Sequence, residues 1–490
     1  MTRFDDWLAR RARETPDHPA LVAGDRSWSY EALDAEVTTF ARRLASLGVR
    51  AGDRVASLLH NGPTPAVLVH AALRLGATLV PLNVRLSPAE IAWQLADARP
   101  ALLLVESRTA PLVQHDAAPC PAVDVAQLAA IAEADVPLRT AHDAAEVLAI
   151  IHTSGTTGQP KGAMLTVGNF WWSAEGSARN LGVLPADRWL AVLPLFHVGG
   201  LSILLRAAIY GITAVVHEGF DTRAVNAAID HEGITIVSVV AVMLQRMLDA
   251  RGDAPFPRSL RCVLLGGGPA PRPLLERCAA IRVPVVQTYG LTETASQVAT
   301  LAPDEALRRL GSAGRVLHPN ALRIATAEGG DAPPGEPGEI QVRGPVVMAG
   351  YAGRPDATAR ALEEGWLHTG DVGMLDADGY LYVLDRRDDL IISGGENVYP
   401  AEVEAALLAD ARVAECGVIG EADAQWGQRV VAVVRLHDGA APDAATAESL
   451  REHCRARLAR YKVPAEVRFV GEPLPRTASG KLRRGQLKSS

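Results

Sequence analysis

Residues 147–162 read VLAIIHTSGTTGQPKG, and this stretch decides the fold class. Its apolar start, Val147–Ile151, is typical of a buried strand, and a loop rich in glycine and hydroxyl side chains follows directly. Glycines let backbone N–H groups converge on an anion, hydroxyls add donors, and a lysine adds a positive charge. The stretch therefore predicts a strand followed by a loop that holds nucleotide phosphates. The candidate phosphate-binding residues are Thr153, Ser154, Gly155, Thr156, Thr157, Gly158 and Lys161.

This loop is not a Walker A loop. That motif requires G-x-x-x-x-G-K-[ST], whereas here Pro160 precedes Lys161 and Gly162 follows it. The ordinary alternative is a flexible surface turn. The alternation of hydroxyls and glycines directly after a buried strand disfavours that alternative.

Strands alternate with helices on both sides of the loop, which predicts parallel sheets covered by helices. A first sheet is expected from strands at 54–59, 78–82 and 147–151, and a second from strands at 213–216, 234–239, 261–265 and 284–287. From about Gly311 the chain becomes rich in glycine and proline, which indicates turn-rich β structure. After Asp385 a tail of about a hundred residues has its own αβ pattern.

We therefore predict an α/β protein with two domains. The large N-terminal domain, residues 1–384, contains two helix-covered sheets and a β-rich subdomain, and the small C-terminal α+β domain comprises residues 385–490.

The composition excludes several classes of protein. Of 490 residues, 48% are hydrophobic and 21% charged, which are globular values. The net charge of −7 and the 5% aromatic content argue against a nucleic-acid partner. The five cysteines show neither C-x-x-C nor zinc spacing, which suggests a reducing compartment. With no signal peptide and no apolar run of about 18 residues, we expect a cytoplasmic protein without a membrane span.

Four further motifs follow the loop in order. They read YGLTET at 289–294, GWLHTGD at 365–371, DR at 385–386 followed by ISGGEN at 392–397, and PRTASGK at 475–481. Together with the loop they resemble the signatures of the adenylate-forming superfamily, which comprises acyl-CoA synthetases, luciferases and peptide-synthetase adenylation domains. The resemblance covers nearly the whole chain.

The resemblance implies Mg²⁺ as the cofactor and ATP and CoA as co-substrates. It also implies that the reaction proceeds in two half-reactions. A carboxylic acid is first joined to AMP with release of pyrophosphate, and the acyl group then passes to CoA. It also implies that the C-terminal domain is mobile and turns at Asp385 between the two steps. The catalytic residues would be Lys481, His197, Thr292 and Glu293, with Glu293 as the Mg²⁺ ligand. The nucleotide would also contact Gly267, Gly268, Pro269, Thr288, Tyr289, Gly290, Asp371 and Arg386, and CoA would contact Ser393, Gly394, Gly395 and Trp426.

Arg206 narrows the class of acid that the site could bind. It lies in an apolar run nine residues after His197. A buried arginine needs an anionic partner, either a protein carboxylate or a second carboxylate on the substrate. The runs at 194–202, 264–276 and 287–297 are similar to those of the o-succinylbenzoate–CoA ligases of menaquinone biosynthesis. This resemblance implies a substrate with an aromatic and a succinyl carboxylate. The acid-binding residues would be His197, Arg206, Gly266 and Ser296.

Other functions remain open at this point. A general aryl- or fatty-acyl-CoA synthetase would share every motif except those facing the acid. An amino-acid adenylation module would normally pass its acyl group to a carrier domain with a G-G-x-S site. Residues 199–202 read GGLS and match that pattern, but they lie in mid-domain after a strand. A serine hydrolase would need a G-x-S-x-G elbow, which is absent. A non-enzymatic ATP-binding regulator would need neither Glu293 nor Lys481. The expected partners are small molecules, and the oligomeric state, a homo-oligomer included, is left open.

Overall fold

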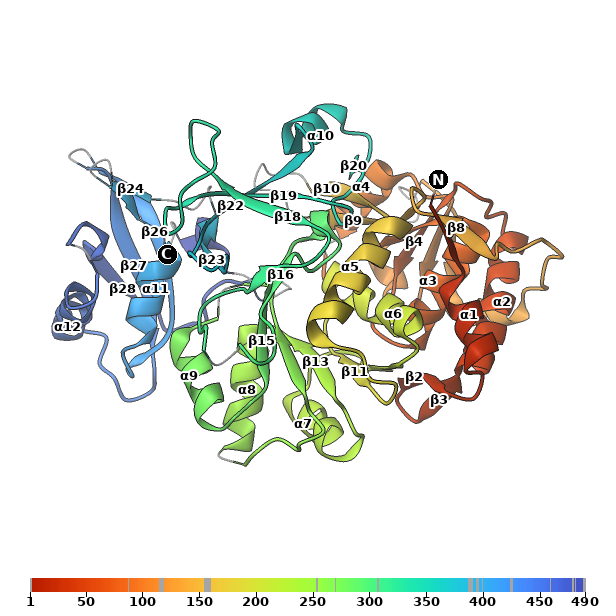
Figure 1. Cartoon of the computed structure of the whole chain (residues 1–490), viewed down its shortest axis with the longest axis horizontal. Helices are drawn as coiled ribbons and strands as arrows, with labels where there is room; N and C mark the ends of the chain where they lie inside the picture. The colour runs from red at the N-terminus through yellow and green to blue at the C-terminus, as the bar shows by residue number, and fades with distance from the viewer. Residues whose placement is uncertain are drawn as a thin grey trace.

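The computed structural model describes residues 2–86, 88–113, 119–153, 160–252, 254–268, 270–305, 308–386, 391–393, 396–398, 400–423, 426–458, 460–477, 480 and 482–487. Within these residues the chain forms four large sheets and one two-stranded ladder (Figure 1). No helix in the described ranges combines the length and the apolar composition that crossing a membrane requires.

The first sheet contains the strand that opened the sequence analysis. Its central strands are parallel, and the last two strands at one edge are antiparallel to their neighbours. In spatial order its strands are β20 (Gly350–Tyr351), β10 (Lys161–Thr166), β9 (Val147–Thr153), β5 (Thr78–Pro81), β4 (Arg54–Leu58), β6 (Leu102–Val105) and β7 (Ala122–Asp124).

The second sheet has nine strands, and it is parallel in its centre and antiparallel at both edges. In spatial order its strands are β17 (Arg315–Val316), β16 (Ala299–Thr300), β15 (Val285–Tyr289), β14 (Cys262–Leu265), β13 (Ile236–Val239), β11 (Arg188–Ala191), β12 (Thr213–Val216), β2 (Pro19–Ala23) and β3 (Arg26–Ser29). The two predicted sheets are therefore present.

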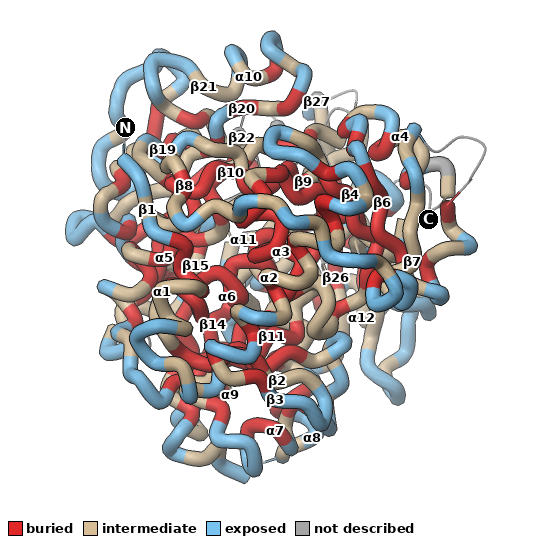
Figure 2. The backbone as a smooth tube through the Cα atoms, turned by 90° about the vertical axis from the view of Figure 1, so that its right-hand side faces the viewer, coloured by how far each residue is buried: buried red, intermediate tan, exposed pale blue. Residues whose placement is uncertain are grey.

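A layer of helices lies between the two sheets and shares one apolar core with both. Its members are α2 (Tyr30–Ser46), α3 (Pro63–Leu75), α5 (Val167–Leu181) and α6 (Val198–Tyr210). Nearly every residue of α3 from Ala66 and of α6 is buried, as expected for helices that are apolar on all sides. Figure 2 shows this buried layer in the middle of the molecule.

The outer faces are covered by further helices. The far side of the second sheet packs on α7 (Thr222–His231), α8 (Ala241–Arg251) and α9 (Arg272–Ala280), and the far side of the first sheet packs on α4 (Pro88–Ala98). The N-terminal segment contributes β1 (Arg3–Asp5), which pairs with β8 (Ala141–Asp143), and then α1 (Trp7–Glu14).

The β-rich part is a third, antiparallel sheet. Its strands are β18 (Ala321–Ala325), β19 (Gly338–Arg343), β22 (Trp366–Leu375), β21 (Leu362–Glu363) and, beside β22, β23 (Leu381–Arg386). The helix α10 (Pro355–Ala361) precedes β21.

The C-terminal elements gather at one end of the molecule around their own apolar core (Figure 1). They are β24 (Ile391–Ser393), β25 (Glu396–Val398), β26 (Val413–Asp423), β27 (Gly427–Leu436), β28 (Glu466–Phe469), α11 (Pro400–Leu408), α12 (Ala444–Arg455) and α13 (Arg484–Leu487). The predicted domain boundary between residues 384 and 385 falls inside β23. That boundary stays a prediction.

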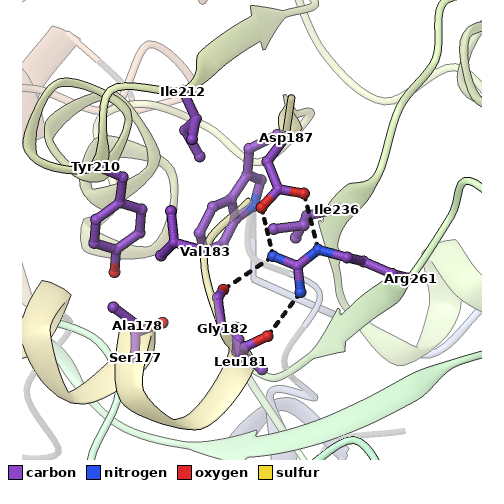
Figure 3. A pocket seen from close by; sticks show the side chains of 11 residues that line it. Ser177, Ala178, Leu181, Gly182, Val183, Asp187, Tyr210, Ile212, Ile236 and Arg261 are labelled. Atoms are coloured by element: carbon purple, nitrogen blue, oxygen red, sulfur yellow. Dashed lines mark hydrogen bonds and ion pairs between the residues drawn. The ribbon is translucent and has the colours of Figure 1, made fainter. Parts of the chain in front are cut away.

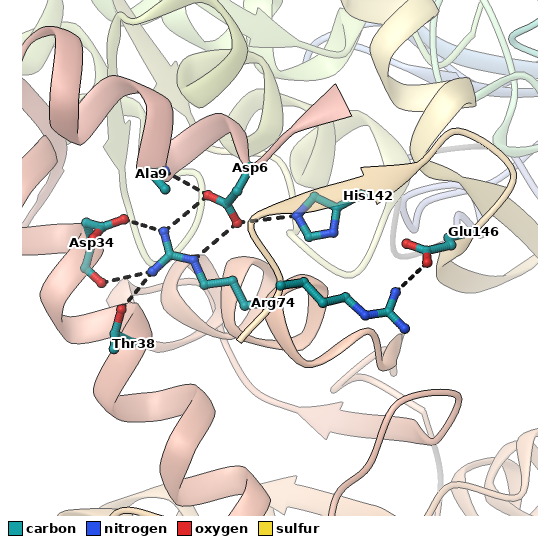
Figure 4. A network of polar contacts seen from close by, with 8 residues as sticks. Asp6, Ala9, Asp34, Thr38, Arg74, His142 and Glu146 are labelled. Carbon is teal, nitrogen blue, oxygen red and sulfur yellow. Dashed lines mark hydrogen bonds and ion pairs between the residues drawn. The ribbon is translucent and has the colours of Figure 1, made fainter. Parts of the chain in front are cut away.

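A buried ion network fastens the N-terminal segment to α3 (Figure 4). The Arg74 guanidinium donates to both carboxylate oxygens of Asp6, each at 3.1 Å, and also to Asp34. Asp6 in turn accepts from the Ala9 N–H at 2.7 Å and thereby caps α1. Burial opposes ionisation of Asp6, but hydrogen bonds from His142 and Arg74 and the charge of Arg74 lower the pKa of Asp6 below its usual range.

Arg74→Ala should therefore destabilise the protein strongly, because it leaves the Asp6 carboxylate buried without its counter-charge. The free energy of unfolding should fall by about 3–5 kcal/mol near neutral pH. The deficit should shrink as the pH falls below about 4, because Asp6 then takes up a proton in the unfolded chain and in the folded variant, whereas the folded wild type still holds it ionised and so loses stability. Urea unfolding of Arg74→Ala and of the control Arg26→Ala, whose ion pair with Glu36 is exposed, checks this. Equal losses in the two variants would contradict a dominant role for the network.

Candidate active site

The two ends of the phosphate loop are held by adjacent strands. β9 and β10 run antiparallel, and Thr153 pairs with Lys161 at the point where the loop leaves the sheet. The Thr153 hydroxyl donates to the Lys161 carbonyl at 3.4 Å. The loop residues Ser154, Gly155, Thr156, Thr157 and Gly158 lie outside the described residues, so their roles stay predictions. The sheet fixes where the loop begins and ends.

The YGLTET motif lies beside this loop through one tyrosine that the sequence analysis did not single out. The Tyr351 hydroxyl donates to Glu293 Oε1 at 2.8 Å, and Lys161 Nζ lies 5.3 Å from the centroid of the Tyr351 ring. Glu293 belongs to a short 3₁₀ helix, Thr292–Thr294, with Thr292 half-buried beside it. A positive charge and a carboxylate are thus brought together from segments more than a hundred residues apart.

The motif's Tyr289 and Asp371, both predicted to contact the nucleotide, are in contact with each other. The Tyr289 hydroxyl donates to Asp371 Oδ2 at 2.8 Å, and both residues are more than nine-tenths buried. Tyr289 ends β15 of the second sheet, and Asp371 lies in β22 of the third. Arg386 stands opposite Asp371 in the ladder of β22 and β23. The neighbouring Thr288 hydroxyl is hydrogen-bonded to the Thr300 hydroxyl at 2.8 Å within the sheet.

Two glycines are required by close approaches at this edge of the second sheet. A Cβ on Gly290 would lie 1.5 Å from the Ser296 carbonyl oxygen, because the chain turns back through Ala295 and Ser296, both with positive φ. A Cβ on Gly266 would lie 2.8 Å from the Thr288 side chain. A Cβ on Gly268, by contrast, would meet no atom of the described residues within 4 Å. Pro269 lies outside the described residues.

The predicted acid-binding histidine sits at the start of α6. His197 is the N-cap residue of that helix, and its Nε2 is buried with no hydrogen-bond partner in the described part of the chain. Burial, and then the charge of Arg85, lower the pKa of His197 to about 4. The ring is therefore neutral at pH 7 and can donate or accept one hydrogen bond.

The loop before His197 is held by Asn61, a second residue that the sequence analysis missed. Asn61 is buried after the end of β4 in the first sheet. Its amide donates to the Leu193 carbonyl at 2.9 Å and accepts from the Leu195 N–H at 2.8 Å. Asn61 thus joins the first sheet to the loop that carries the histidine.

Arg206 is buried without a carboxylate partner. Only 2% of the residue is exposed, and no carboxylate of the described residues lies within 4 Å of its guanidinium. Its Nη2 donates to the Ser173 hydroxyl at 3.0 Å, and that hydroxyl donates to the Ala295 carbonyl at 2.7 Å. The guanidinium lies 5.6 Å from the Trp189 ring centroid, and its Nε has no hydrogen-bond partner in the described residues. The protein carboxylate that the sequence left open as a partner is not found there.

A crevice next to Trp189 is closed by ordinary structural contacts (Figure 3). Arg261 forms an ion pair with Asp187 at 2.6 Å and donates to the Leu181 carbonyl at 2.7 Å. Its polar groups are thus paired within the protein, and we assign it no part in the site.

The C-terminal part approaches the large domain near Gly267. A Cβ on Gly480 would lie 3.6 Å from the Val240 side chain, and a Cβ on Gly267 would lie 3.1 Å from the same side chain. Lys481 itself lies outside the described residues, as do Gly394 and Gly395. Ser393 ends β24 and pairs with Gly427, and the neighbouring Trp426 is 52% exposed. Gly480, the residue before Lys481, therefore lies beside the predicted nucleotide-binding residue Gly267.

The sequence model of the AMP-binding enzymes matches residues 8–352, and that of the AMP-binding enzyme C-terminal domain matches residues 402–481. The chain belongs to the AMP-binding enzyme family.

Similar members of the family cover the chain from end to end. The 2-succinylbenzoate–CoA ligase of Geobacillus kaustophilus is 51% identical over 100% of this chain and 98% of its own length. The o-succinylbenzoate CoA synthetase of Bacillus subtilis in complex with its acyl-adenylate intermediate is 43% identical, with a TM-score of 0.92, over 100% of this chain and 99% of its own. The same synthetase with ATP and a magnesium ion is 42% identical with a TM-score of 0.92, over 99% of this chain and 100% of its own. The resemblance and the fold class predicted from the sequence are confirmed.

The lowered pKa of His197 should make the free energy of unfolding decrease as the pH falls. Because the folded pKa of about 4 lies below the ordinary value of about 6.5, the unfolded chain binds the proton first as the pH falls. The contribution of His197 to the free energy of unfolding should be full above pH ~6.5 and should decrease down to pH ~4. His197→Gln should lack this decrease, which unfolding measurements from pH 8 to pH 4 would show. The same pH dependence in both proteins would contradict the buried, neutral ring.

Proposed function

We propose that this chain is an AMP-forming acid–CoA ligase that converts 2-succinylbenzoate to its CoA thioester, a step of menaquinone biosynthesis. The function predicted from the sequence is supported by relatives named 2-succinylbenzoate–CoA ligase, which are 44–51% identical to this chain over its full length. The observation that carries the choice of acid is the buried Arg206 guanidinium, which has no carboxylate partner in the described residues.

In the first half-reaction, a carboxylate oxygen of the acid forms a bond to the α-phosphorus of ATP. The bond from that phosphorus to the bridging oxygen breaks, and pyrophosphate leaves with the electron pair. Anion approaches anion, so the site must supply positive charge. We assign this task to Lys161, where the phosphate loop joins β10, and to Lys481, which follows Gly480 in the chain. A Cβ on Gly480 would lie 3.6 Å from the Val240 side chain.

Glu293 fits a magnesium site of the kind that nucleotides use. Mg²⁺ favours oxygen ligands and is held by one or two carboxylates together with phosphates. One Glu293 oxygen is oriented by Tyr351, and the described residues contain no cluster of three or more acidic, histidine or cysteine side chains that would suit another metal. When bound, the ion would supply positive charge to the phosphates of ATP; the Bacillus subtilis relative was solved in complex with ATP and a magnesium ion.

In the second half-reaction the CoA thiol attacks the acyl carbonyl, and AMP leaves. We propose that the C-terminal domain, residues 385–490, turns at Asp385 to bring Ser393, Gly394 and Gly395 to the acyl-adenylate. The exposed Trp426 would then contact CoA. The position of Gly480, where an added Cβ would lie 3.6 Å from the Val240 side chain, supports an arrangement suited to the first step.

The buried arginine favours a diacid over the rival substrates. A guanidinium taken out of water costs several kcal/mol unless an anion compensates it, and the second carboxylate of 2-succinylbenzoate is such an anion. A fatty acid offers no charge at that depth. The carrier-like GGLS run belongs to the first turns of α6, with Ser202 buried, which disfavours an amino-acid adenylation module.

The remaining expectations on partners are part of the proposal. Small-molecule partners without nucleic acid agree with the net charge of −7, and a cytoplasmic location agrees with the free cysteines of the described residues. The choice between a monomer and a homo-oligomer stays open.

Arg206→Ala decides the assignment of the acid. Loss of a largely buried charge partner costs about 3–5 kcal/mol, so KM for 2-succinylbenzoate should rise about 10²-fold or more, with KM for ATP little changed. Arg206→Lys should recover part of the loss, because a point charge remains without the planar fork. The wild type should strongly prefer 2-succinylbenzoate over an analogue that lacks the aromatic carboxylate, and Arg206→Ala should not.

The control is Arg223→Ala, which removes an exposed arginine of α7. It should keep the preference for the diacid. Activation of fatty acids or benzoates by the wild type as well as the diacid would overturn the assigned acid and leave only the ligase class.

Lys481→Ala should separate the two half-reactions. Removing one charged donor should slow acyl-adenylate formation about 10²–10³-fold, measured as pyrophosphate release. Transfer to CoA from supplied acyl-adenylate should change little. Arg483→Ala, which removes an exposed charge two residues away, is the matched control and should affect neither step. Equal damage to both steps in Lys481→Ala would show that the lysine is structural.

A further inference from the structure

Tyr351 stands where the first sheet meets the YGLTET motif, and its backbone is held on both sides. It ends the short edge strand β20, where it pairs with Ala163 of β10. Its N–H donates to the Thr358 hydroxyl at 2.9 Å, and the next N–H, of Ala352, donates to the Gly162 carbonyl at 2.8 Å. The ring therefore has a fixed origin beside the phosphate loop.

The side chain touches two groups that the proposed adenylation needs. Its hydroxyl donates to Glu293 Oε1 at 2.8 Å, and its ring lies 5.3 Å from Lys161 Nζ, within the range of a cation–π contact. A tyrosine hydroxyl carries its proton near neutral pH, so it can act as the donor in this hydrogen bond.

We propose that Tyr351 is a positioning residue that orients the Glu293 carboxylate for Mg²⁺-bound ATP and holds Lys161 at the phosphate loop. The proposal rests on the proposed function, in which Glu293 is the magnesium ligand. It adds a residue outside all the sequence motifs, from a strand 58 residues beyond Glu293.

The physical reason is that a metal ligand binds best when its orientation is fixed beforehand. The second Glu293 oxygen stays directed to one side once Oε1 accepts the tyrosine hydrogen bond. Loss of such an outer partner commonly lowers metal affinity or activity 10–100-fold. The backbone contributes as well, because the Met348 N–H donates to the Glu293 carbonyl at 2.8 Å. Residues 348 and 351 therefore hold both the backbone carbonyl and the side-chain carboxylate of Glu293.

The test compares Tyr351→Phe, which removes only the hydroxyl, with Tyr351→Leu, which removes the ring as well. ATP binding to the full-length protein is measured by calorimetry with and without Mg²⁺, and pyrophosphate release is titrated with Mg²⁺. In Tyr351→Phe the Mg²⁺ concentration for half-saturation should rise about 10-fold, with the Mg²⁺-free ATP Kd and KM for the acid unchanged. Tyr351→Leu should in addition weaken Mg²⁺-free ATP binding, because Lys161 loses its ring.

Two further variants keep the outcomes distinct. Tyr382→Phe removes the hydroxyl of a half-buried tyrosine on β23 and should leave the Mg²⁺ titration unchanged. Glu293→Gln should raise the Mg²⁺ requirement at least as much as Tyr351→Phe, and the double variant should be no worse than Glu293→Gln alone. An unchanged Mg²⁺ titration in Tyr351→Phe, with a raised one in Glu293→Gln, overturns the role of Tyr351 alone. An unchanged titration in Glu293→Gln overturns the proposed metal ligand, and no acyl-adenylate from any acid overturns the proposed function.

Discussion

The hydrogen bond from Tyr289 to Asp371 is the contact on which the rest of the site depends. It joins the end of the second sheet to the third sheet at 2.8 Å, with both partners nearly excluded from water. A carboxylate at such a position is costly unless hydrogen bonds satisfy it. The bond therefore fixes how the two sheets meet. It thereby sets the relative positions of the glycines at 266–268, the YGLTET motif and β22, the strand that carries Asp371.

The fold and much of the site could be predicted because their signals are local. A strand that runs into a glycine- and hydroxyl-rich loop, and helices between apolar strands, are patterns within about twenty residues. The residues that the sequence did not single out act across long separations. Asn61 reaches Leu193 over 132 residues, Ser173 reaches Ala295 over 122, and Tyr351 reaches Glu293 over 58. No periodicity or spacing records such contacts, which exist only after the sheets have packed.

Two buried arginines show why pairing, rather than burial, separates a structural charge from one available to a ligand. Arg74 and Arg206 are exposed to 4% and 2%. Arg74 forms ion pairs with two carboxylates, which compensate its positive charge, so its role is to stabilise the fold. Arg206 meets a hydroxyl and an aromatic ring, which leave its charge uncompensated among the described residues. From sequence alone both are arginines in apolar helices.

The pairing of β22 with β23 has a mechanical consequence. Asp371 lies opposite Arg386, and the next residue, Val372, lies opposite Asp385. The proposed rotation at Asp385 would thus begin one ladder step from Asp371, which we expect to contact the nucleotide. The proposed nucleotide contact and the proposed pivot therefore lie on one antiparallel pair of strands, so a ligand held at Asp371 would act on the same backbone ladder that carries Asp385.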